Sequence, residues 1–264
     1  MPQLIRNLPQ SEYLALDLAS KSGLSLILRS PAHYRYARSN PSEPSSAQAL
    51  GTLAHATILE PESVPKNFAI TPQVDRRTKA GKEEWAEYEK SSEGLIRVTE
   101  EQWELAQGMR EAVLADPQAA ILLGVGEPEL TVIWEDENTG LGIKNRFDWW
   151  NPDHRIIIDL KTTRNASKQK VSRDCGEYGY HLQNALYLEG ARRNGLDPQG
   201  FLFIFVESSP PHGVALYELD EANVHAGMVK CWRALEILAE CKRTNTWPNY
   251  PPGIHTIEIP PWLV

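Results

Sequence analysis

Apolar residues follow a helical pattern through the first half of the chain. Short helices are expected over residues 1–40, with Ser11 and Ser22 as candidate N-caps, and a helix of small residues is expected over 47–59. An amphipathic helix over 99–123 begins with a capping box, Thr99 and Gln102, and is interrupted by Pro117. Residues 1–70 are therefore expected to form a helical lead-in.

The pattern changes to β-strands after residue 127. Strands are expected over 130–134, 143–150, 155–162, 201–207 and 214–219, with a helix over 178–194 after the third strand. A long amphipathic helix over 220–242 follows the last strand. A three-strand meander, a helix, two further strands and a covering helix together predict an α/β fold. We expect one domain with a core at 127–219, in which helices flank a central mixed sheet.

Three segments fit neither pattern. Residues 40–46 are expected to be a linker and helix cap. Residues 71–94 are the most polar part of the chain, and the default expectation is a solvated or disordered loop. The alternative is a mobile basic arm that contacts DNA through Arg76, Arg77, Lys79 and Lys82. The tail from Thr246 onward is proline-rich and extended, and in an oligomer it could reach a neighbour.

Composition narrows the class of protein. The 264 residues are 41% hydrophobic and 23% charged, as in ordinary globular proteins, and neither a membrane span nor a signal peptide is evident. A cytoplasmic location is expected. Three scattered cysteines are too few for a disulfide framework or a four-thiolate cluster. The net charge of −8 argues mildly against a protein that coats nucleic acid, although basic side chains can still line one channel.

The residues most suited to a catalytic or metal site lie in one predicted hairpin, KNRFDWWNPDHRIIIDLKTT at residues 144–163. Asp148 and Asp159 lie on either side of a turn, and Lys161 shares a face with Asp159 because side chains alternate along a strand. If Asn151 and His154 pair across a two-residue loop, Asp148 lies opposite Ile157 and diagonal to Asp159. A three-residue loop would separate the two acids onto different faces.

Two carboxylates and an ammonium group at one strand end suit Mg²⁺ or Mn²⁺, which prefer oxygen ligands. From the spacing alone, a solvated ion pair on the surface of an ordinary hairpin is an equally good interpretation.

A family resemblance favours the first interpretation. Asp148, ten intervening residues and Asp159-Leu160-Lys161 resemble the PD-(D/E)XK nuclease motif, although Phe147 occupies the position where that motif usually has proline. The phrases SGLSLILRSPAHY, GTLAHATILEPE, PELTVIWEDENTGLGIKNRFDWW, IIIDLKTT and YGYHLQNALYLEGA occur in the order found in nucleases of the exonuclease VIII (RecE) type. These are recombination exonucleases of phages and prophages.

The resemblance implies a set of site residues. His55, Asp148, Asp159 and the Leu160 carbonyl match the metal ligands, and Lys161 matches the catalytic lysine. Gln183 and Tyr187 match helix residues that complete the site, and Glu129 matches an acid on the first core strand. Ser22 and Arg29 are comparable to 5′-phosphate contacts of distant relatives, while Arg164 and Lys168 belong to a basic stretch that could line a DNA channel.

The implied activity is a double-strand DNA exonuclease, working 5′→3′ with one or two Mg²⁺ or Mn²⁺ ions and without an iron–sulfur cluster. It would leave 3′ single strands for an annealing protein of the RecT type. It would act on DNA ends as a homo-oligomer, for which the family suggests a ring. The alternatives are an endonuclease or end-processing nuclease of the same fold, or an inactive DNA-binding protein. The intact set of Asp148, Asp159 and Lys161 argues against inactivity.

Overall fold

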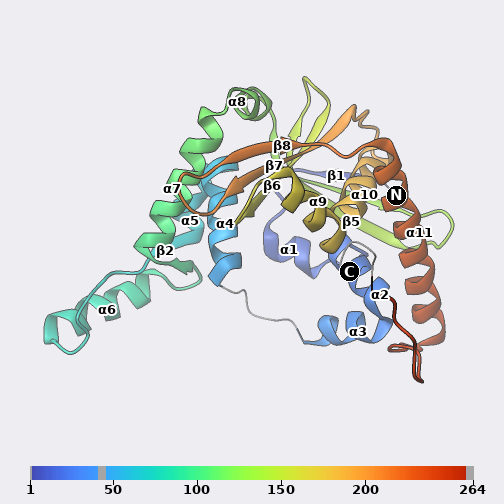
Figure 1. Cartoon of the computed structure of the whole chain (residues 1–264). Coiled ribbons are helices and arrows are strands. Elements are labelled where there is room, and N and C mark those ends of the chain that lie inside the picture. Colours follow the sequence, from blue (N-terminus) through green and yellow to red (C-terminus); the bar gives the residue numbers. More distant parts are fainter. Residues whose placement is uncertain (1, 41–45, 260–264) are drawn as a thin grey trace.

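A six-stranded sheet forms the centre of the computed structural model, which describes residues 2–40 and 46–259 (Figure 1). Its strand order is β1-β4-β5-β6-β7-β8, and all neighbours are antiparallel except β6 and β7. The strands are β1 Gln3–Ile5, β4 Glu127–Glu135, β5 Gly142–Asn151, β6 Ile156–Thr163, β7 Gly200–Glu207 and β8 Val214–Tyr217. The mixed α/β architecture and the β4–β5–β6 meander confirm the predicted fold. Strand β1 lies where only helices were expected.

Helices cover both faces of this sheet (Figure 1). One face, with Ile158 and Ile204, packs against α4 (Ser46–Leu59), α7 (Glu100–Ala115) and α8 (Pro117–Gly124). The other face, with Ile157 and Phe203, packs against α9 (Lys168–Glu177) and α10 (Tyr180–Arg193). The two helical layers contact different residues because side chains alternate along each strand.

A third apolar cluster surrounds α10. Helices α2 (Lys21–Arg29), α3 (Pro31–Ser39) and α11 (Glu221–Thr244) contribute to it, and Leu24 and Ile27 of α2 are buried there as predicted. Helix α11 lies against α10 at Gly227, where an added Cβ would be 2.1 Å from the carbonyl oxygen of His181. The short helix α1 (Gln10–Ala15) precedes this group. Helix α10 is therefore held between the sheet and α11.

The local helix signals are partly confirmed. Thr99 and Gln102 form the predicted capping box, and Pro117 begins a new helix after Ala115. The N-cap of α2 is Ser20, whose hydroxyl accepts a hydrogen bond from Gly23 N, so the prediction of Ser22 as the cap is wrong by two residues. Ser11 lies inside α1 and is not its cap. A hydroxyl residue two positions away offers the same local signal, which is why sequence alone did not separate them.

The expectation of a loop over 71–94 is wrong. Residues Lys79–Ser91 form helix α6, which extends away from the body in Figure 1. Thr78 caps it by accepting from Gly81 N, and Arg76 lies 4.2 Å from the centre of the Trp85 ring. These contacts stabilise a helix that the polar composition of the segment did not predict.

A small second sheet connects α6 to the body. It contains β2 (Phe68–Ile70) and β3 (Ile96–Val98), which pair in parallel after η1 (Pro61–Ser63) and α5 (Val64–Asn67). Most of the predicted linker, residues 41–45, lies outside the described residues, as do residues 260–264 of the tail. Among the helices that the structure describes, none combines the length and apolarity needed to cross a membrane.

Candidate active site

The β5–β6 hairpin brings the two aspartates together through a register that differs from the predicted one. The paired residues are Asn151 with Ile156, Trp150 with Ile157, and Trp149 with Ile158. Continuing this register places Asp148 opposite Asp159, not opposite Ile157. The predicted two-residue loop is therefore wrong, and the loop has four residues.

Asn151 explains the longer loop. Its side-chain oxygen accepts a hydrogen bond from His154 N at 2.9 Å, and Arg155 adopts a positive φ of 55°. This asparagine-closed turn adds two residues to the loop. Because the shift is an even number of residues, Asp148 and Asp159 remain on one face, and the predicted pair survives the error.

Asp148 lies between the hairpin and helix α4. Its Oδ2 accepts a hydrogen bond from Leu160 N at 2.9 Å and lies 3.6 Å from His55 Nδ1. Helix α4 comes this close because Gly51, one turn before His55, faces Thr162, whose hydroxyl would be 3.4 Å from an added Cβ. Burial lowers the pKa of His55 although Asp148 opposes that shift. The imidazole is therefore neutral at neutral pH, which is the form that binds metals.

Asp159 is buried and has two charged or polar neighbours. Its Oδ1 accepts a hydrogen bond from Gln183 Nε2 of α10, and its Oδ2 forms an ion pair with Lys161. Burial, reinforced by Asp148 and opposed by Lys161, raises the pKa of Asp159 to about 7. Burial alone would lower the pKa of Lys161, but Asp159 and Asp148 outweigh it and raise that pKa above its usual value. The lysine therefore carries its proton at neutral pH.

Two tyrosines of α10 complete this side of the site. Lys161 Nζ lies 5.3 Å from the centre of the Tyr180 ring. Tyr187 is enclosed by aromatic rings, with Phe147 at 5.5 Å and Phe201 at 6.0 Å. Burial raises the pKa of Tyr187 well above its ordinary value, so its hydroxyl remains a proton donor. The predicted face of α10 is thus directed at the two aspartates.

Glu129 lies on β4 beside Asp148. The pairs Pro128–Trp149 and Leu130–Phe147 place it opposite Asp148, and its φ is +49°, which is unusual for a residue other than glycine. Arg146 Nη1 lies 3.5 Å from its carboxylate. Burial and Asp148 outweigh this arginine and raise the pKa of Glu129 to about 8. In the metal-free protein Glu129 is therefore mostly protonated at neutral pH, because carboxyl groups are crowded at this strand end.

These residues have the donor chemistry of a divalent-cation site. Asp159 Oδ2 is buried and, apart from the Lys161 ion pair, accepts no well-oriented hydrogen bond. No three or more His, Cys, Asp or Glu side chains in the described ranges 2–40 and 46–259 are grouped so that they alone could hold a metal. Mg²⁺ does not need such a group, because it usually takes one or two carboxylates and completes its shell with water and substrate phosphate. The aspartate pair fits that mode of binding.

Comparison with known proteins identifies the family. A profile described as "PDDEXK-like domain of unknown function (DUF3799)" matches residues 20–258. The chain belongs to this family. Among curated protein sequences, none matches it significantly.

One solved structure has the same fold over nearly its whole length. An inferred exonuclease from Eubacterium rectale superposes with a TM-score of 0.61 at 14% identity, covering 94% of this chain and 96% of the other. A phage-related exonuclease from Haemophilus somnus 129PT aligns over 74% of this chain and 95% of its own, at 12% identity and a TM-score of 0.36. The first likeness shows that nearly the whole chain shares one fold with that structure. Nucleases of this kind typically use divalent metals.

Beside the aspartates, the PDDEXK-like chain has a pocket that sequence reasoning missed. Gln183 and Tyr187 of α10 form one wall, and the start of α2 forms another with Ser20, Lys21 and Ser22. The other lining residues are Tyr13, Leu14, Leu18, Gly23, Leu26, Tyr34, Ala37, Arg38 and Lys144. Three basic residues, Lys21, Arg38 and Lys144, therefore line one cavity beside Gln183. Arg38 is paired with Asp17, and Lys144 Nζ donates to the carbonyls of Tyr13 and Leu16.

Lys21 is the most notable of these residues. Its Nζ donates to the Tyr178 carbonyl at 2.6 Å and lies 5.6 Å from the Tyr180 ring centre, on which Lys161 also rests. Burial and Lys161 lower the pKa of Lys21 to about 8, although Asp159 opposes them. In the sequence, the one feature that marks Lys21 is its position directly after the N-cap Ser20. Lysine is common at the start of helices, so this position does not by itself indicate a functional residue.

The predicted DNA contacts are distributed over different places. Ser22 lines the pocket. Arg29 lies at the other end of α2, where its Nε donates to the Tyr250 hydroxyl at 3.2 Å, and it does not line the pocket. Arg164 and Lys168 are exposed in the segment that follows β6. The structure thus brings Ser22 to the site and uses Arg29 to hold the C-terminal segment.

Proposed function

We propose that this protein is a metal-dependent exonuclease that degrades double-stranded DNA from its 5′ ends and leaves 3′ single strands. The observation that carries the proposal is the convergence of Asp148, Asp159 and Lys161 beside a pocket with three basic residues. Family membership and fold support a nuclease. The exonuclease names of the similar structures support action at DNA ends, as does a pocket that opens directly beside the carboxylates.

The chain's own residues have distinct roles in this proposal. Asp148, Asp159, the Leu160 carbonyl and His55 would hold one or two Mg²⁺ or Mn²⁺ ions, which stabilise charge on the phosphate and favour deprotonation of the attacking water. Gln183 keeps Asp159 in position through its amide. Tyr187 lines the pocket, where its hydroxyl would donate to a phosphate oxygen.

Lys161 acts as a fixed positive charge. Its ammonium is held by Asp159 and rests on the Tyr180 ring, and its raised pKa keeps it protonated. A charged lysine can orient water and stabilise the pentacoordinate phosphate, but it cannot accept a proton. We therefore propose that Lys161 orients the attacking water and stabilises charge on the phosphate.

The start of α2 is the proposed place for the DNA end. Ser20, Ser22 and Lys21 offer hydroxyl and ammonium donors within one pocket, and a terminal phosphate carries more negative charge than an internal one. A cytoplasmic enzyme of this type would pass its single strands to an annealing protein, and it would work as a homo-oligomer. The alternative activity within the fold is an endonuclease, because one core can serve several substrates.

One experiment distinguishes these activities. Linear and covalently closed circular duplexes are incubated with the protein, each with Mg²⁺ or with a chelator, alongside Asp159→Ala and Lys161→Ala. We expect loss of linear DNA alone, dependent on metal and on both residues, and end-labelled duplexes then report polarity. Cutting of the circle would favour an endonuclease, and binding without cleavage would favour an inactive DNA-binding protein.

Matched variants control for folding. Asp153→Ala changes an exposed aspartate in the loop of the same hairpin, and Lys66→Ala changes an exposed lysine on α5. Both are expected to keep the wild-type rate. A comparable loss of activity in these controls would show that the effects of Asp159→Ala and Lys161→Ala are not specific to the site.

A further inference from the structure

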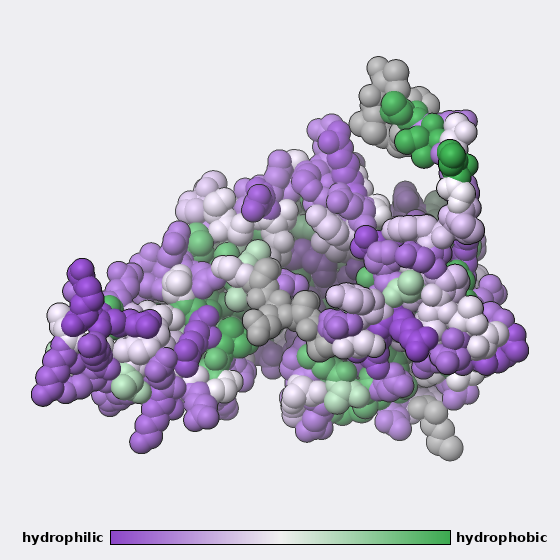
Figure 2. Space-filling model, turned by 90° about the horizontal axis from the view of Figure 1, so that it is seen from below, coloured by the Kyte–Doolittle hydropathy of each residue, from purple (hydrophilic) through white to green (hydrophobic). Residues whose placement is uncertain are grey.

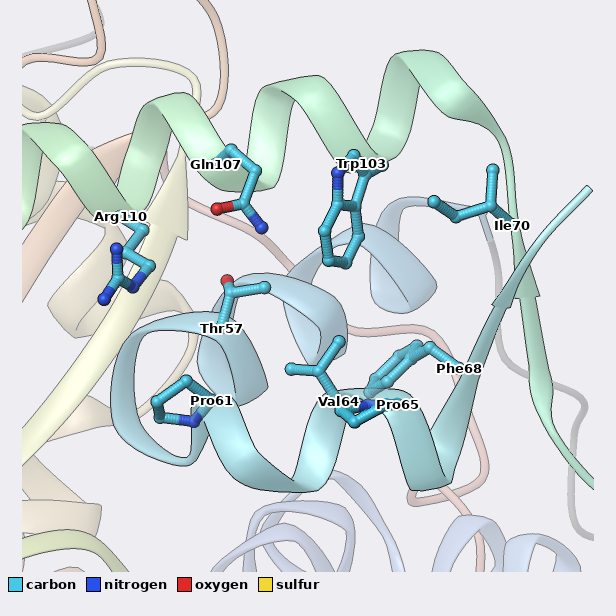
Figure 3. Close-up of a pocket in the computed structure, with 9 residues that line it drawn as sticks. All are labelled: Thr57, Pro61, Val64, Pro65, Phe68, Ile70, Trp103, Gln107 and Arg110. Atoms are coloured by element: carbon cyan, nitrogen blue, oxygen red, sulfur yellow. The ribbon is translucent and has the colours of Figure 1, made fainter.

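An apolar groove lies between α7 and the segment from α4 to β2. Figure 3 shows side chains of α7 directed toward those of the opposite wall across an open space. Six of its nine lining residues are apolar, and they come from the η1–α5–β2 segment and α7: Pro61, Val64, Pro65, Phe68, Ile70 and Trp103. The others are Thr57, Gln107 and Arg110. The groove has the prolines and the aromatic ring that suit an extended, proline-flanked peptide.

Arg110 supplies the only charge in the lining of this groove. Its guanidinium forms no ion pair with any residue between 2 and 40 or between 46 and 259. Ile70 of β2, which lines the groove, is 38% exposed, and Ile96 of the neighbouring strand β3 is 40% exposed. An apolar partner with one negative charge would therefore complement both the shape and the charge of this surface.

The C-terminal segment of the chain has these properties. Trp247 stacks on Tyr34 at 5.8 Å, and the Tyr250 hydroxyl accepts from Arg29, so the chain is held to α2 and α3 as far as residue 250. Beyond that point residues 251–259 are all exposed, including Ile254 at 104%, Ile257 at 86% and Ile259 at 65%. Glu258 lies between the last two isoleucines. Figure 2 shows this hydrophobic segment standing away from the body at upper right.

The segment does not lie in its own groove. Figure 1 places α5, β2 and α7 on the opposite side of the molecule from the tail. The tail begins at the end of α11, beside α2 and α3. Nine residues beyond Tyr250 span about 30 Å when fully extended, and the anchor at Tyr250 fixes where that reach begins. The tail of a second copy is not anchored to this molecule, so its reach does not depend on the position of Tyr250 here.

We propose that residues 251–259 of one copy bind in the Pro61–Arg110 groove of a second copy. Ile257 and Ile259, which point to the same side of an extended chain, would enter the apolar part of the groove, and Glu258 would be available to Arg110. Prolines at 251 and 252 stiffen the segment and reduce the entropy that binding costs. Each copy offers one tail and one groove, so the contact is head-to-tail and can close into a ring.

The test measures molar mass in solution by light scattering across a range of protein concentrations. The tail variant Ile257→Glu/Ile259→Glu and the groove variant Ile70→Glu each change exposed residues, so both should fold, which circular dichroism verifies. We expect the wild type to associate and each variant to need at least tenfold more protein for the same association. Ile121→Glu, which changes another exposed isoleucine on α8, should associate as the wild type does.

A mixture of the two variants makes the test specific. The tail variant retains an intact groove and the groove variant retains an intact tail, so one competent contact exists between them. We expect a heterodimer from the mixture, although neither variant alone forms a dimer at that concentration. A monomeric wild type, unchanged association of the variants, or no heterodimer would overturn the proposal. The proposal rests on the homo-oligomer of the proposed function, but nuclease activity does not enter this measurement, so failure of the tail contact is distinguishable from failure of the cleavage assay.

Discussion

Gln183 is the residue through which helix α10 acts on the site. Its Nε2 is the hydrogen-bond donor to Asp159 Oδ1, and both side chains are buried. A donor to a carboxylate stabilises the charged form and so lowers its pKa. Gln183 is therefore a positioning residue that holds Asp159 in place.

Replacing Gln183 should affect rate and pH dependence together. We expect Gln183→Ala to lower kcat about 10- to 100-fold, as removal of a residue supporting a metal ligand typically does. The acid limb of the pH–rate profile should move to higher pH because Asp159 loses a stabilising donor. Gln199→Ala, an exposed glutamine near Asp197, is the matched control. An unchanged acid limb would exclude this role even if the rate fell.

Glu129 should make the metal-free protein less stable as pH rises. Its folded pKa of about 8 lies above its ordinary value of 4.5, so between these values the folded state binds more protons than the unfolded state. Stability from this group is full at low pH and is lost as pH rises toward 8. Burial and Asp148 are the causes, and Arg146 only partly offsets them.

The prediction is tested by urea unfolding in chelator from pH 5 to pH 8. We expect Glu129→Gln to flatten the decline and to be more stable than the wild type at pH 8, by on the order of 1–3 kcal/mol. Glu111→Gln, on the exposed surface of α7, should follow the wild-type curve. Parallel curves for wild type and Glu129→Gln would contradict the assignment.

At the scale of elements, the site depends on how closely α10 and α11 pack. Gly227 of α11 lies against the backbone of α10, where an added Cβ would be 2.1 Å from His181 O and 2.6 Å from His181 C. Backbone cannot rotate away as a flexible side chain can. Any larger residue at Gly227 must therefore separate the two helices and move Gln183 and Tyr187.

We expect Gly227→Ala to destabilise the protein by about 2 kcal/mol, a typical cost of overpacking. Calorimetry should show a Tm lower by about 5 °C, and kcat should fall because α10 shifts. Gly124→Ala is the matched control, since nothing lies within 4 Å of its Cβ position at the end of α8. If Gly227→Ala keeps the wild-type Tm, the two helices are not packed as described.

At the scale of the whole molecule, the proposed function requires an acidic protein to bind an acidic polymer. The net charge is −8, yet Lys21, Arg38 and Lys144 line one pocket. Affinity for DNA should then come from few phosphate contacts, with a small dependence on salt. Each neutralised phosphate contributes about −0.9 to the slope of log K against log salt concentration for duplex DNA.

Lys21→Ala should therefore reduce the magnitude of that slope by about 1 and weaken binding equally for all sequences. Fluorescence anisotropy with a short duplex measures both quantities, with Ca²⁺ present to suppress cleavage. The salt concentration is varied from about 50 to about 200 mM, a range over which DNA affinities change measurably. Lys66→Ala serves as the control. A wild-type slope for Lys21→Ala would show that its ammonium does not contact phosphate.

The sequence by itself determined the features that neighbouring residues encode. Strand alternation, helical periodicity, the Thr99 capping box and the helix start at Pro117 are local, and they predicted the order of elements in the core. The spacing of Asp148, Asp159 and Lys161 also follows from alternation along two adjacent strands. An error of two residues in the hairpin loop left it intact because strand geometry repeats every two residues.

Only the tertiary structure decided which distant segments meet. Lys21 reaches Tyr180, and Glu129 becomes buried against Asp148, through closure of the whole chain around α10 and the sheet. Helix α6 was not predicted because it lies in a polar stretch without an apolar pattern, and a few local contacts, such as the Thr78 cap, stabilise it. The groove and the exposed tail likewise arise from segments far apart in sequence, whose juxtaposition no local pattern records.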